Sequence, residues 1–542
     1  MNKGDLTRKL PWILLGLLMA GSGVLLFSLT AGFTFIADEW DLVLLRPGWN
    51  PETLLSPFHE HIVIAPALIF KLLQSIFGMG SPRPMQVASI GTFLATALLL
   101  FVWLRSRVGD WAALIGAAIV LFLGAAFEDL LWAFQIGYFG SLACGIGALI
   151  ALDRDDRHGD VAASILLVAS LSFSSLGMPF VAGAVIEWLT NPRSRRHRWI
   201  VPAAPLAFYA LWWLGWGHEA DSDVTLSNLP DLPGYVWDAA SAGMTSMLGL
   251  ATGDGSEPDQ PHLIWGRIAL LLVAGLTVWR LVKLGRIPRG VLICGAIALA
   301  FFGLAALGQN ELRPPTSSRY QLPAVIFILL FAGELLRGIR IPAPALGVAA
   351  AVVAATSLSG VDLMRDQAEA RWKPSAVANQ VSLGAIALAK DAARPDFVLN
   401  LVSVSVPIER YLDEVDSSGS PGYGAEEIAG LDAAHRGLAD QTLIDVEGLQ
   451  LSGEGPGLAQ SCRLLPATPG TPITVYPGQV AAVSNPENRV TTVAVSRFGD
   501  PPGFAVGSIL PRSRAWLTLP ADGSTRPWQV TLDGRGRVGA CS

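Results

Sequence analysis

The sequence predicts a polytopic α-helical membrane protein followed by a C-terminal β-sandwich outside the membrane. Of the 542 residues, 51% are hydrophobic and only 15% are charged, which is too apolar for a soluble protein of this length. Long apolar runs recur up to Gly360, and alternating segments bounded by Gly, Pro, Asn and Asp follow from Phe397. The formal net charge is -6, and the sequence contains no block of basic residues. Membrane lipids are therefore expected partners, and nucleic acid is not.

Eleven apolar runs are predicted as membrane spans. The first follows a basic N-terminus like a signal peptide, but it is about 25 residues long and lacks a small-residue cleavage site, so we expect a retained anchor. The run 62–77 is shorter and holds Lys71 and Gln74, which favours an interfacial or re-entrant helix. The fifth and sixth runs are also short, and a shallow hairpin is an alternative for them. The predicted spans cover residues 12–36, 85–104, 111–127, 134–152, 161–174, 177–190, 199–217, 263–282, 290–308, 322–336 and 342–360.

The distribution of basic residues predicts the orientation. About seventeen Lys and Arg side chains fall in segments that eleven spans place on one side, against about six on the other. The positive-inside rule then puts the N-terminus in the cytoplasm and everything after residue 360 outside. Cys462 and Cys541 bracket the polar C-terminal region, and the disulfide that this suggests requires an oxidising compartment. The two arguments agree on an extracytoplasmic C-terminus.

Three domains follow from these patterns. Residues 1–361 form the membrane domain, whose first outer loop covers 37–84 and includes the interfacial helix 62–77. Residues 362–396 are alanine-rich and are predicted as a helical connector, and 397–542 as a β-rich domain. The predicted strands lie in the runs 397–406, 471–476, 490–495 and 528–532.

An acidic cluster follows the first span. Asp38, Glu39 and Asp41 surround Trp40 where the chain leaves the membrane. A single carboxylate at such a position is usually just solvated, but three within four residues favour a functional site. The other polar and aromatic candidates that the topology places on the same side are His59, Glu60, His61, Glu128, Asp129, Trp132, Gln135, Arg313, Arg319 and Tyr320.

The sequence Asp38-Glu39-Trp40-Asp41, the outer loop with a membrane-lying helix and the C-terminal β domain together resemble the GT-C superfamily of polyprenyl-phosphate-sugar-dependent glycosyltransferases. The resemblance covers the whole chain in layout and only the acidic stretch in motif. It implies that Asp38 is the base or orients the acceptor hydroxyl, with Glu39 as its partner. It also implies a polyprenyl-phosphate sugar donor and a cell-envelope glycan or glycolipid acceptor, outside a bacterial cytoplasmic membrane. The Gly-, Ala- and Arg-rich composition suggests a high-GC genome, for which arabinose or mannose is the expected sugar.

The chemistry of sugar transfer supports the same roles. An inverting transfer needs a carboxylate to take the proton of the acceptor hydroxyl and a cation to stabilise the leaving phosphate. We expect Asp38 as the base, and Arg319 with Arg313 at the phosphate, because guanidinium forks match phosphate oxygens. Tyr320 adds a hydroxyl donor, although Arg319 and Tyr320 also suit an interfacial anchor pair. Glu128 and Asp129 are equally explained by a polar turn at the interface.

Metal binding is not demanded by the sequence. Residues His59, Glu60 and His61 are adjacent, whereas zinc ligands on a helix are about three or four residues apart. We therefore assign no metal ligands and expect these residues to contact acceptor or phosphate. The family resemblance leaves open a divalent cation (Mg, Mn or Ca) near Asp38, held together with Glu128.

Two other functions remain open at this stage. A secondary transporter or flippase of lipid-linked sugars would place charges at the midplane of paired repeats, and the sequence shows no such symmetry. A non-catalytic envelope scaffold would use the β domain to bind glycan, although eleven spans exceed what a tether needs. The β domain is expected to resemble a carbohydrate-binding module, with a sugar-binding face drawn from its exposed aromatic residues. These aromatics include Tyr411, Tyr423, Phe498, Phe504, Trp516 and Trp528.

Overall fold

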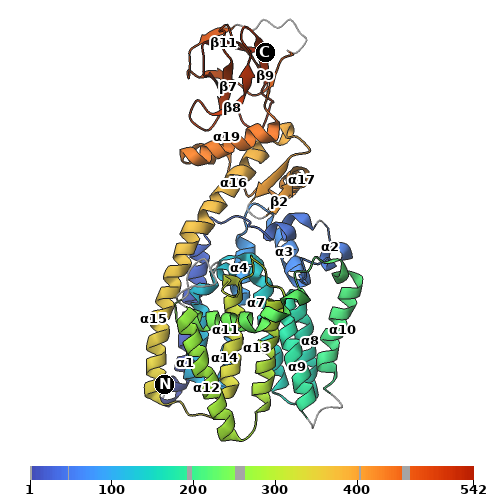
Figure 1. Cartoon of the computed structure of the whole chain (residues 1–542), viewed down its shortest axis with the longest axis vertical. Helices are drawn as coiled ribbons and strands as arrows, with labels where there is room; N and C mark the ends of the chain where they lie inside the picture. The colour runs from blue at the N-terminus through green and yellow to red at the C-terminus, as the bar shows by residue number, and fades with distance from the viewer. Residues whose placement is uncertain are drawn as a thin grey trace. The chain divides into compact units, whose positions relative to one another are not determined.

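The computed structural model describes residues 3–46, 48–191, 198–250, 263–401, 404–454 and 464–541. The chain forms two compact units. Unit 1 comprises Met1–Ala31, Arg46–Lys71 and Arg83–Ala370, and unit 2 comprises Gly32–Leu45, Leu72–Pro82 and Arg371–Ser542. Long helices make up unit 1 and most strands belong to the C-terminal part (Figure 1). The predicted class, an apolar helical part followed by a β-rich region, is confirmed.

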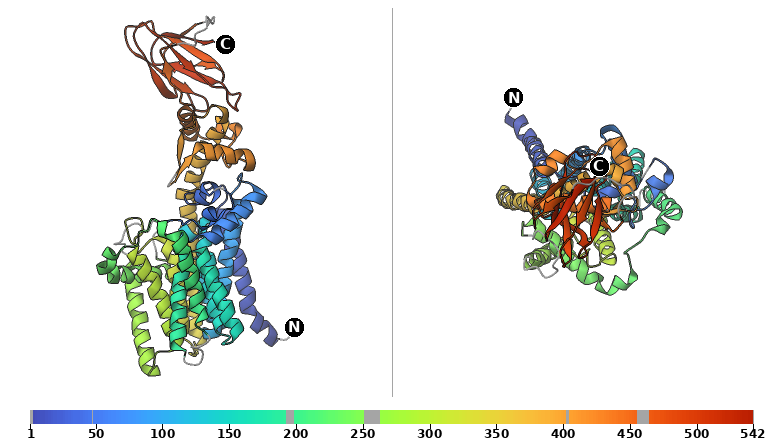
Figure 2. Two further views of the ribbon diagram at one scale, coloured as in Figure 1. Left: turned by 90° about the vertical axis from the view of Figure 1, so that its right-hand side faces the viewer. Right: turned by 90° about the horizontal axis from the view of Figure 1, so that it is seen from above.

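Unit 1 is built of helices that run side by side, many of them roughly parallel (Figure 2). The helices α1 and α3 to α5 follow the apolar runs of the N-terminal third, and α3 ends within unit 2. The α-helices are α1 (Lys3–Leu29), α2 (Pro51–Leu55), α3 (Ile64–Phe77), α4 (Arg83–Val108), α5 (Asp110–Leu121), α6 (Phe127–Leu131), α7 (Ile136–Leu152), α8 (Arg157–Phe173), α9 (Met178–Thr190), α10 (Ile200–Gly215), α11 (Leu232–Met247), α12 (Leu263–Leu284), α13 (Arg289–Leu307), α14 (Gln321–Leu335) and α15 (Ala343–Gln367). Short 3-10 turns are η2 (Gly124–Ala126), η3 (Ala133–Gln135), η4 (Ser175–Gly177), η5 (Gly217–Glu219), η6 (Leu226–Asp231) and η7 (Ser318–Tyr320).

Each of the eleven predicted spans contains a helix. Among the described residues, six helical segments are long and apolar enough to cross a membrane, or seven if the bent pair α5 with Gly124–Leu131 counts as one. The number of spans and their orientation therefore stay predictions. The six are Lys9–Leu29, Arg83–Val108, Ala133–Leu152, Arg289–Leu307, Ser318–Leu335 and Ala343–Leu388.

The core of unit 1 is sealed by close helix packing. Helix α7 packs against α4 and α8, and small polar side chains bridge the helices. Thr96 donates to the carbonyl of Phe139 at 2.8 Å, and the hydroxyls of Ser141 and Ser170 lie 3.0 Å apart. Each of these groups is buried, and the bonds satisfy hydroxyls that would otherwise be costly in an apolar core.

The third predicted span is broken rather than continuous. Helix α5 ends at Leu121, whose carbonyl accepts a hydrogen bond from Ser22 at 2.8 Å, and the chain bends by 43° into the segment Gly124–Leu131. At the break the backbone of Gly124 lies so close to α15 that a Cβ there would lie 2.3 Å from the carbonyl oxygen of Gly360. Only glycine permits this approach.

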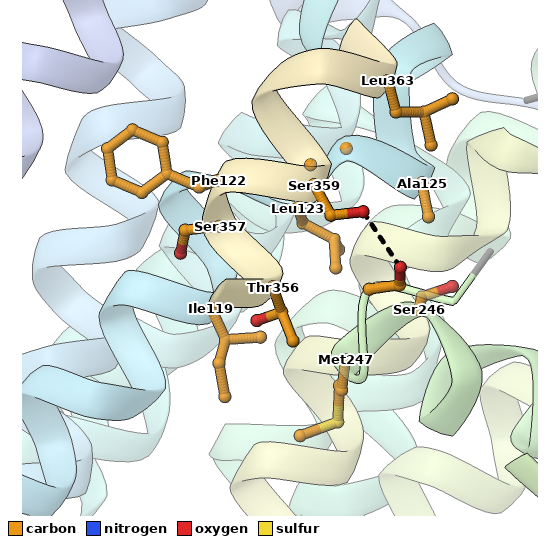
Figure 3. A pocket seen from close by; sticks show the side chains of 13 residues that line it. Ile119, Phe122, Leu123, Ala125, Ser246, Met247, Thr356, Ser357, Ser359 and Leu363 are labelled. Atoms are coloured by element: carbon orange, nitrogen blue, oxygen red, sulfur yellow. Dashed lines mark hydrogen bonds between the residues drawn. The ribbon is translucent and has the colours of Figure 1, made fainter. Parts of the chain in front are cut away.

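A small cavity lies beside this crossing (Figure 3). Its walls come from α5, η2, α15 and the end of α11, and the Ser359 hydroxyl donates to the Gly249 carbonyl at 3.1 Å across one side. None of the candidate residues predicted from the sequence lines this cavity. It belongs to the helix crossing and not to the candidate site.

The predicted connector is helical, and the segment after it contains helices that the sequence analysis did not predict. The predicted connector contains η8 (Ala368–Trp372), α16 (Lys373–Leu388) and η9 (Lys390–Ala392). The run 397–406, interpreted as one strand, forms part of a hairpin of β1 (Val398–Leu401) and β2 (Val404–Pro407) outside the two larger sheets. Three helices follow within the segment predicted as β-rich, and α19 packs against α16. They are α17 (Ile408–Ser418), α18 (Ala425–Ala429) and α19 (Ala433–Glu447).

Two antiparallel sheets form the C-terminal sandwich. One sheet has the order β5-β10-β7-β8, and the other β3-β9-β6-β11-β4. Alternate residues such as Val493 and Val495 of β7 and Trp528 and Val530 of β10 are buried, as expected for strands that each cover one core. The strands are β3 (Leu451–Ser452), β4 (Leu465–Ala467), β5 (Ile473–Val475), β6 (Val480–Ser484), β7 (Thr491–Ser496), β8 (Phe504–Ile509), β9 (Arg514–Thr518), β10 (Trp528–Leu532) and β11 (Gly536–Cys541).

Two predictions for this domain have different outcomes. Tyr411, Phe498 and Trp528 are buried, so these three aromatics pack the interior and do not form a sugar-binding face. Cys541 is buried at the end of β11, whereas Cys462 lies outside the described residues. The disulfide between them stays a prediction.

Candidate functional site

A tight turn presents the first polar group of the site. Phe58 and His61 exchange two backbone hydrogen bonds of 3.0 and 2.9 Å, which places His59 and Glu60 at the corner. His59 has a φ of 47° and is exposed, so its backbone is in the left-handed region that a non-glycine residue rarely adopts. Glu60 and His61 are half-buried. The turn therefore separates the two histidines, and only His61 is half-buried beside Glu60.

Glu60 forms an ion pair with Arg313. The distance from Arg313 Nη1 to Glu60 Oε1 is 2.5 Å, and the two side chains are only 15% and 16% exposed. Arg313 Nη2 also lies 3.1 Å from Asp223, which is 48% exposed. The second oxygen of Glu60 is buried and has no hydrogen-bond partner among the described residues. The Arg313 guanidinium is thus paired with the half-buried carboxylate of Glu60 on one side and with the exposed carboxylate of Asp223 on the other.

The pKa values of Glu60 and His61 are both below their ordinary values. Burial acts to raise the pKa of Glu60, but the nearby charges of His61 and Arg313 outweigh it. Burial lowers the pKa of His61, and Arg313 and Arg319 lower it further, against the opposing effect of Glu60. Glu60 is therefore a carboxylate paired with Arg313 at neutral pH, and His61 loses its proton more readily than an ordinary histidine does.

The turn η7 brings a second guanidinium to the same surroundings. Arg319 donates from Nη2 to the carbonyl of Leu312 at 3.2 Å, while its buried Nε has no partner among the described residues. Ser318 fixes the neighbouring bend, because its hydroxyl donates to the Ala125 carbonyl at 2.7 Å and accepts from the Glu128 amide at 3.2 Å. Arg319, predicted from the sequence, therefore lies beside the helix that carries Glu128.

Asp129 is more buried than the sequence analysis expected. Glu128 and Asp129 lie in helix α6 and not in a solvated turn. Asp129 is completely buried, and neither of its carboxylate oxygens has a hydrogen-bond partner among the described residues. Glu128 and Arg319 are close enough to interact electrostatically with the Asp129 carboxylate, the first by repulsion and the second by attraction. Gln135, 3% exposed, also has an unpartnered side-chain oxygen. Native proteins leave few such groups unsatisfied, and each one needs an explanation.

Aromatic side chains connect the turn to the segment after α6. The ring of Phe58 lies 4.8 Å from His59 and 5.1 Å from Phe134, and Phe134 lies 5.4 Å from Trp132, measured between centroids. Trp132 is half-buried. These contacts fix the height of the His59–His61 turn relative to the start of α7.

Tyr320 and Tyr235 complete the surroundings of the arginines. Tyr320 is half-buried and its ring packs 6.3 Å from Phe301. The hydroxyl of Tyr235 donates to the Arg313 carbonyl at 3.3 Å. The sequence analysis missed Tyr235 and Asp223, because both lie in the long segment between two predicted spans, where no apolar run drew attention to them. Its many polar residues gave no signal that singled out these two.

The acidic cluster after the first span lies in unit 2. Trp40 has no exposed surface and packs 5.4 Å from Phe35 and 6.4 Å from Tyr411 of α17. Glu39 is 3% exposed, and its Oε2 accepts the backbone N–H of Ile36 at 2.9 Å. Asp38 and Asp41 are half-buried, and Asp41 begins the π-helical turn η1 (Asp41–Leu45). Trp40 and Glu39 therefore fix the loop that presents Asp38.

The predicted residues thus fall into two groups. Unit 1 brings together Glu60, His61, Arg313 and Arg319, with Glu128, Asp129, Trp132, Gln135 and Tyr320 close in the chain or in space. Unit 2 carries Asp38, Glu39 and Asp41. Within the described ranges, no three His, Cys, Asp or Glu side chains are arranged to hold a metal ion.

Comparisons with known proteins give two weak structural matches. No family model matches the chain, and no curated protein matches it. The crystal structure of ArnT from Cupriavidus metallidurans bound to undecaprenyl phosphate is similar to it with a TM-score of 0.45 and 13% identity, over 74% of this chain and 84% of that one. The apo structure of the same protein gives a TM-score of 0.44 and 12% identity, over 77% and 90%. At this level of similarity the function has to be argued from the side chains of this chain.

Proposed function

We propose that the protein is an integral membrane glycosyltransferase that transfers a sugar from a polyprenyl-phosphate donor to a cell-envelope glycan or glycolipid. The reaction takes place on the outer face of a bacterial cytoplasmic membrane, with inversion at the anomeric carbon. The sugar is a pentose or hexose such as arabinose or mannose. The observation that carries the proposal is the cluster of Glu60, His61, Arg313 and Arg319, where guanidinium groups lie beside buried polar atoms that have no hydrogen-bond partner in the described part of the chain.

The arginines suit a lipid-linked phosphate. The buried Nε of Arg319 has no partner among the described residues. One nitrogen of Arg313 pairs with Asp223, an exposed carboxylate that an anion can replace. Charge-assisted bonds to phosphate are about twice as strong as neutral ones, and they grow stronger as the leaving group gains charge. Tyr320, next in the chain, adds a hydroxyl donor. Arg319 directly precedes α14, and the segment Ser318–Leu335 is apolar enough to span a membrane, so this arginine is at the depth where a headgroup would lie.

Asp38 is the proposed base. Its carboxylate takes the proton of the acceptor hydroxyl as the hydroxyl oxygen forms a bond to the anomeric carbon and the bond from that carbon to the phosphate oxygen breaks. The polyprenyl phosphate leaves with the bonding electron pair, and the arginines stabilise the negative charge that it gains. Glu39, which holds the turn through Ile36, keeps Asp38 in position.

Substitution of Asp38 tests the base directly. We expect Asp38→Asn to fold and to bind donor as the wild type does, and to lose transfer by about 10²-fold or more. Asp362→Asn is the matched control, because Asp362 is 74% exposed on α15 and outside the site. Full activity of Asp38→Asn would remove Asp38 from the role of base.

A further inference from the structure

The segment that carries Glu60 has little regular structure of its own. Among the described residues between 46 and 63, α2 is the only helix, and one isolated bridge pairs Phe58 with His61. Backbone carbonyls outside helices and sheets need other hydrogen-bond donors. The position of Glu60 therefore depends on side chains that contact this segment.

Arg46 holds the segment just before the turn. The residue is 5% exposed. Its Nη1 donates to the carbonyl oxygens of Ser56 at 2.8 Å and Thr53 at 3.3 Å, and its Nη2 donates to that of Pro57 at 3.0 Å. The Ser56 hydroxyl also lies 3.1 Å from Nη1. The N–H groups of a guanidinium form a rigid planar fork, so one side chain fixes these backbone positions together.

Trp212 attaches the same segment to helix α10. Its indole Nε1 donates to the Leu55 carbonyl at 2.8 Å, and the residue is only 4% exposed. Helix α2, which ends at Leu55, lies next to α10 in Figure 1. Arg46 therefore closes the segment on itself, and Trp212 fixes it to the helices of unit 1.

The chain between Pro57 and Glu60 has little freedom. Phe58 and His61 exchange two backbone hydrogen bonds of 3.0 and 2.9 Å, so the turn that they close moves as a unit. The hydrogen bond from Ser175 Oγ to the Glu60 carbonyl is long, at 3.3 Å, and adds little. A displacement of the Pro57 carbonyl is therefore passed on to Glu60.

The ion pair of Glu60 with Arg313 depends on this placement. Arg313 Nη1 and Glu60 Oε1 are 2.5 Å apart, and both side chains are mostly buried. Hydrogen bonds between charged groups are short and weaken steeply when they are misaligned. Even a small shift of the turn would therefore weaken the pair and allow Arg313 to change its orientation.

We infer that Arg46 is a positioning residue, which places Glu60 against Arg313 by holding the backbone carbonyls that precede the turn. Its consequence for sugar transfer rests on the proposed function, in which Arg313 contacts the donor phosphate, whereas the placement of Glu60 does not. The sequence carries no signal for this role, because the acceptors are backbone carbonyls, which every residue has.

The first test measures the coupling of Arg46 to the ion pair by thermal unfolding of the full-length protein in detergent. Arg313→Gln is introduced into the wild type, into Arg46→Gln and into Arg83→Gln. Arg83 is the matched control, because it donates to the Phe27 carbonyl at 3.0 Å and begins α4, outside the segment 46–63. Coupled residues have non-additive effects. We expect Arg313→Gln to lower the melting temperature equally in the wild type and in Arg83→Gln, and by about half as much or less in Arg46→Gln.

The second test measures sugar transfer and separates geometry from charge. Arg46→Lys keeps the positive charge but does not reproduce the planar fork. We expect Arg46→Lys and Arg46→Gln both to lower kcat by about 10-fold or more. The KM for the donor should change less, because the interaction that is lost is made mainly in the transition state. Absence of transfer in the wild type would contradict the proposed function, and the unfolding test would still decide the role of Arg46.

Two results would overturn the inference. An equal effect of Arg313→Gln in all three backgrounds would mean that Arg46 stabilises only its own segment, and full transfer by Arg46→Lys would leave it a purely electrostatic role. If Arg46→Gln does not fold, Trp212→Phe takes its place, since phenylalanine keeps an aromatic ring and removes the N–H donor to Leu55. A smaller reduction of the Arg313→Gln effect is then expected, and full additivity would show that this segment does not control the ion pair.

Discussion

Replacing Arg313 by Gln separates a structural role of this residue from a functional one. Arg313 and Glu60 form an ion pair at 2.5 Å, with side chains 15% and 16% exposed. A hydrogen bond between charged groups contributes about 1.5–3 kcal/mol. Removing one partner of a fully buried pair costs about 3–5 kcal/mol, and this site is not fully buried. We therefore expect Arg313→Gln to lower the free energy of unfolding by about 2–3 kcal/mol.

A second substitution makes the result decisive. In Arg313→Gln the Glu60 carboxylate is left without its cation, and Glu60→Gln in the same chain removes that unpaired charge. We expect the double variant to regain stability to within about 1 kcal/mol of the wild type. Sugar transfer should stay at least about 100-fold below the wild type in both variants, because the donor to the leaving phosphate is missing in both.

The two quantities are measured separately. Thermal unfolding in detergent reports stability, and release of polyprenyl phosphate from a lipid-linked sugar reports transfer. Recovery of transfer together with stability in the double variant would refute the reasoning, since Arg313 would then serve only to neutralise Glu60. Equal instability of the single and double variants would contradict the assigned ion pair.

Three further predictions concern the fold. Gly360→Ala should disrupt the crossing of α15 with the broken span, because the new Cβ would lie 2.2 Å from the carbonyl oxygen of Phe122. The control is Gly347→Ala in the same helix, whose Cβ meets nothing within 4 Å and which should be neutral or stabilising. Thermal unfolding distinguishes the two variants. Asp440→Asn should lower the free energy of unfolding by about 2–3 kcal/mol, because the Asp440 carboxylate accepts hydrogen bonds from the backbone N–H groups of Arg497, Phe498 and Gly499 at 2.8, 2.8 and 2.9 Å. The control Asp445→Asn, at an exposed position of the same helix α19, should leave it unchanged. Denaturant unfolding measures both. Burial and the charge of Asp522 raise the pKa of Glu447 to about 8, so between its ordinary pKa of 4.5 and this value the folded state holds a proton that the unfolded state has released. The stability of the wild type should therefore fall relative to that of Glu447→Gln as the pH rises from about 5 to 8. Parallel pH profiles of stability for the two proteins would contradict this prediction.

Periodicity in the sequence was sufficient to locate the long apolar helices and several of the strands. Every apolar run predicted to span coincides with a helix over most of its length, and the runs 471–476, 490–495 and 528–532 coincide with β5, β7 and β10 to within one or two residues. These segments are specified locally, because apolar length and alternation directly reflect burial. The break after Leu121 was missed, since it depends on Ser22 and Gly360, which are distant in the chain.

The helices between the hairpin and the sandwich were also missed, although the chain carries signals for them. Asp432 accepts from the His435 amide as an N-cap, and Gly448 ends α19 in the left-handed conformation with a φ of 65°. This pair is the expected start and stop of a helix. The alternating pattern of residues 397–406 favoured strands for the whole segment, and these helix caps were not used in the prediction.

The candidate site shows the same division between local and distant information. Residue type and topology selected Glu60, Arg313 and Arg319, but the pairing of Glu60 with Arg313 joins residues 253 positions apart. The complete burial of Asp129 also depends on the fold and not on its neighbours in the chain. The sequence therefore indicates which residues belong to the site, while their partners require the structure.

The central claim is turnover of a lipid-linked sugar, and reconstitution tests it most directly. The purified protein in lipid vesicles is incubated with a panel of polyprenyl-phosphate sugars, with and without a cell-envelope glycan acceptor. The account predicts acceptor-dependent loss of one donor and release of an equal amount of polyprenyl phosphate, abolished in Asp38→Asn. Stoichiometric binding of donor without turnover would contradict it.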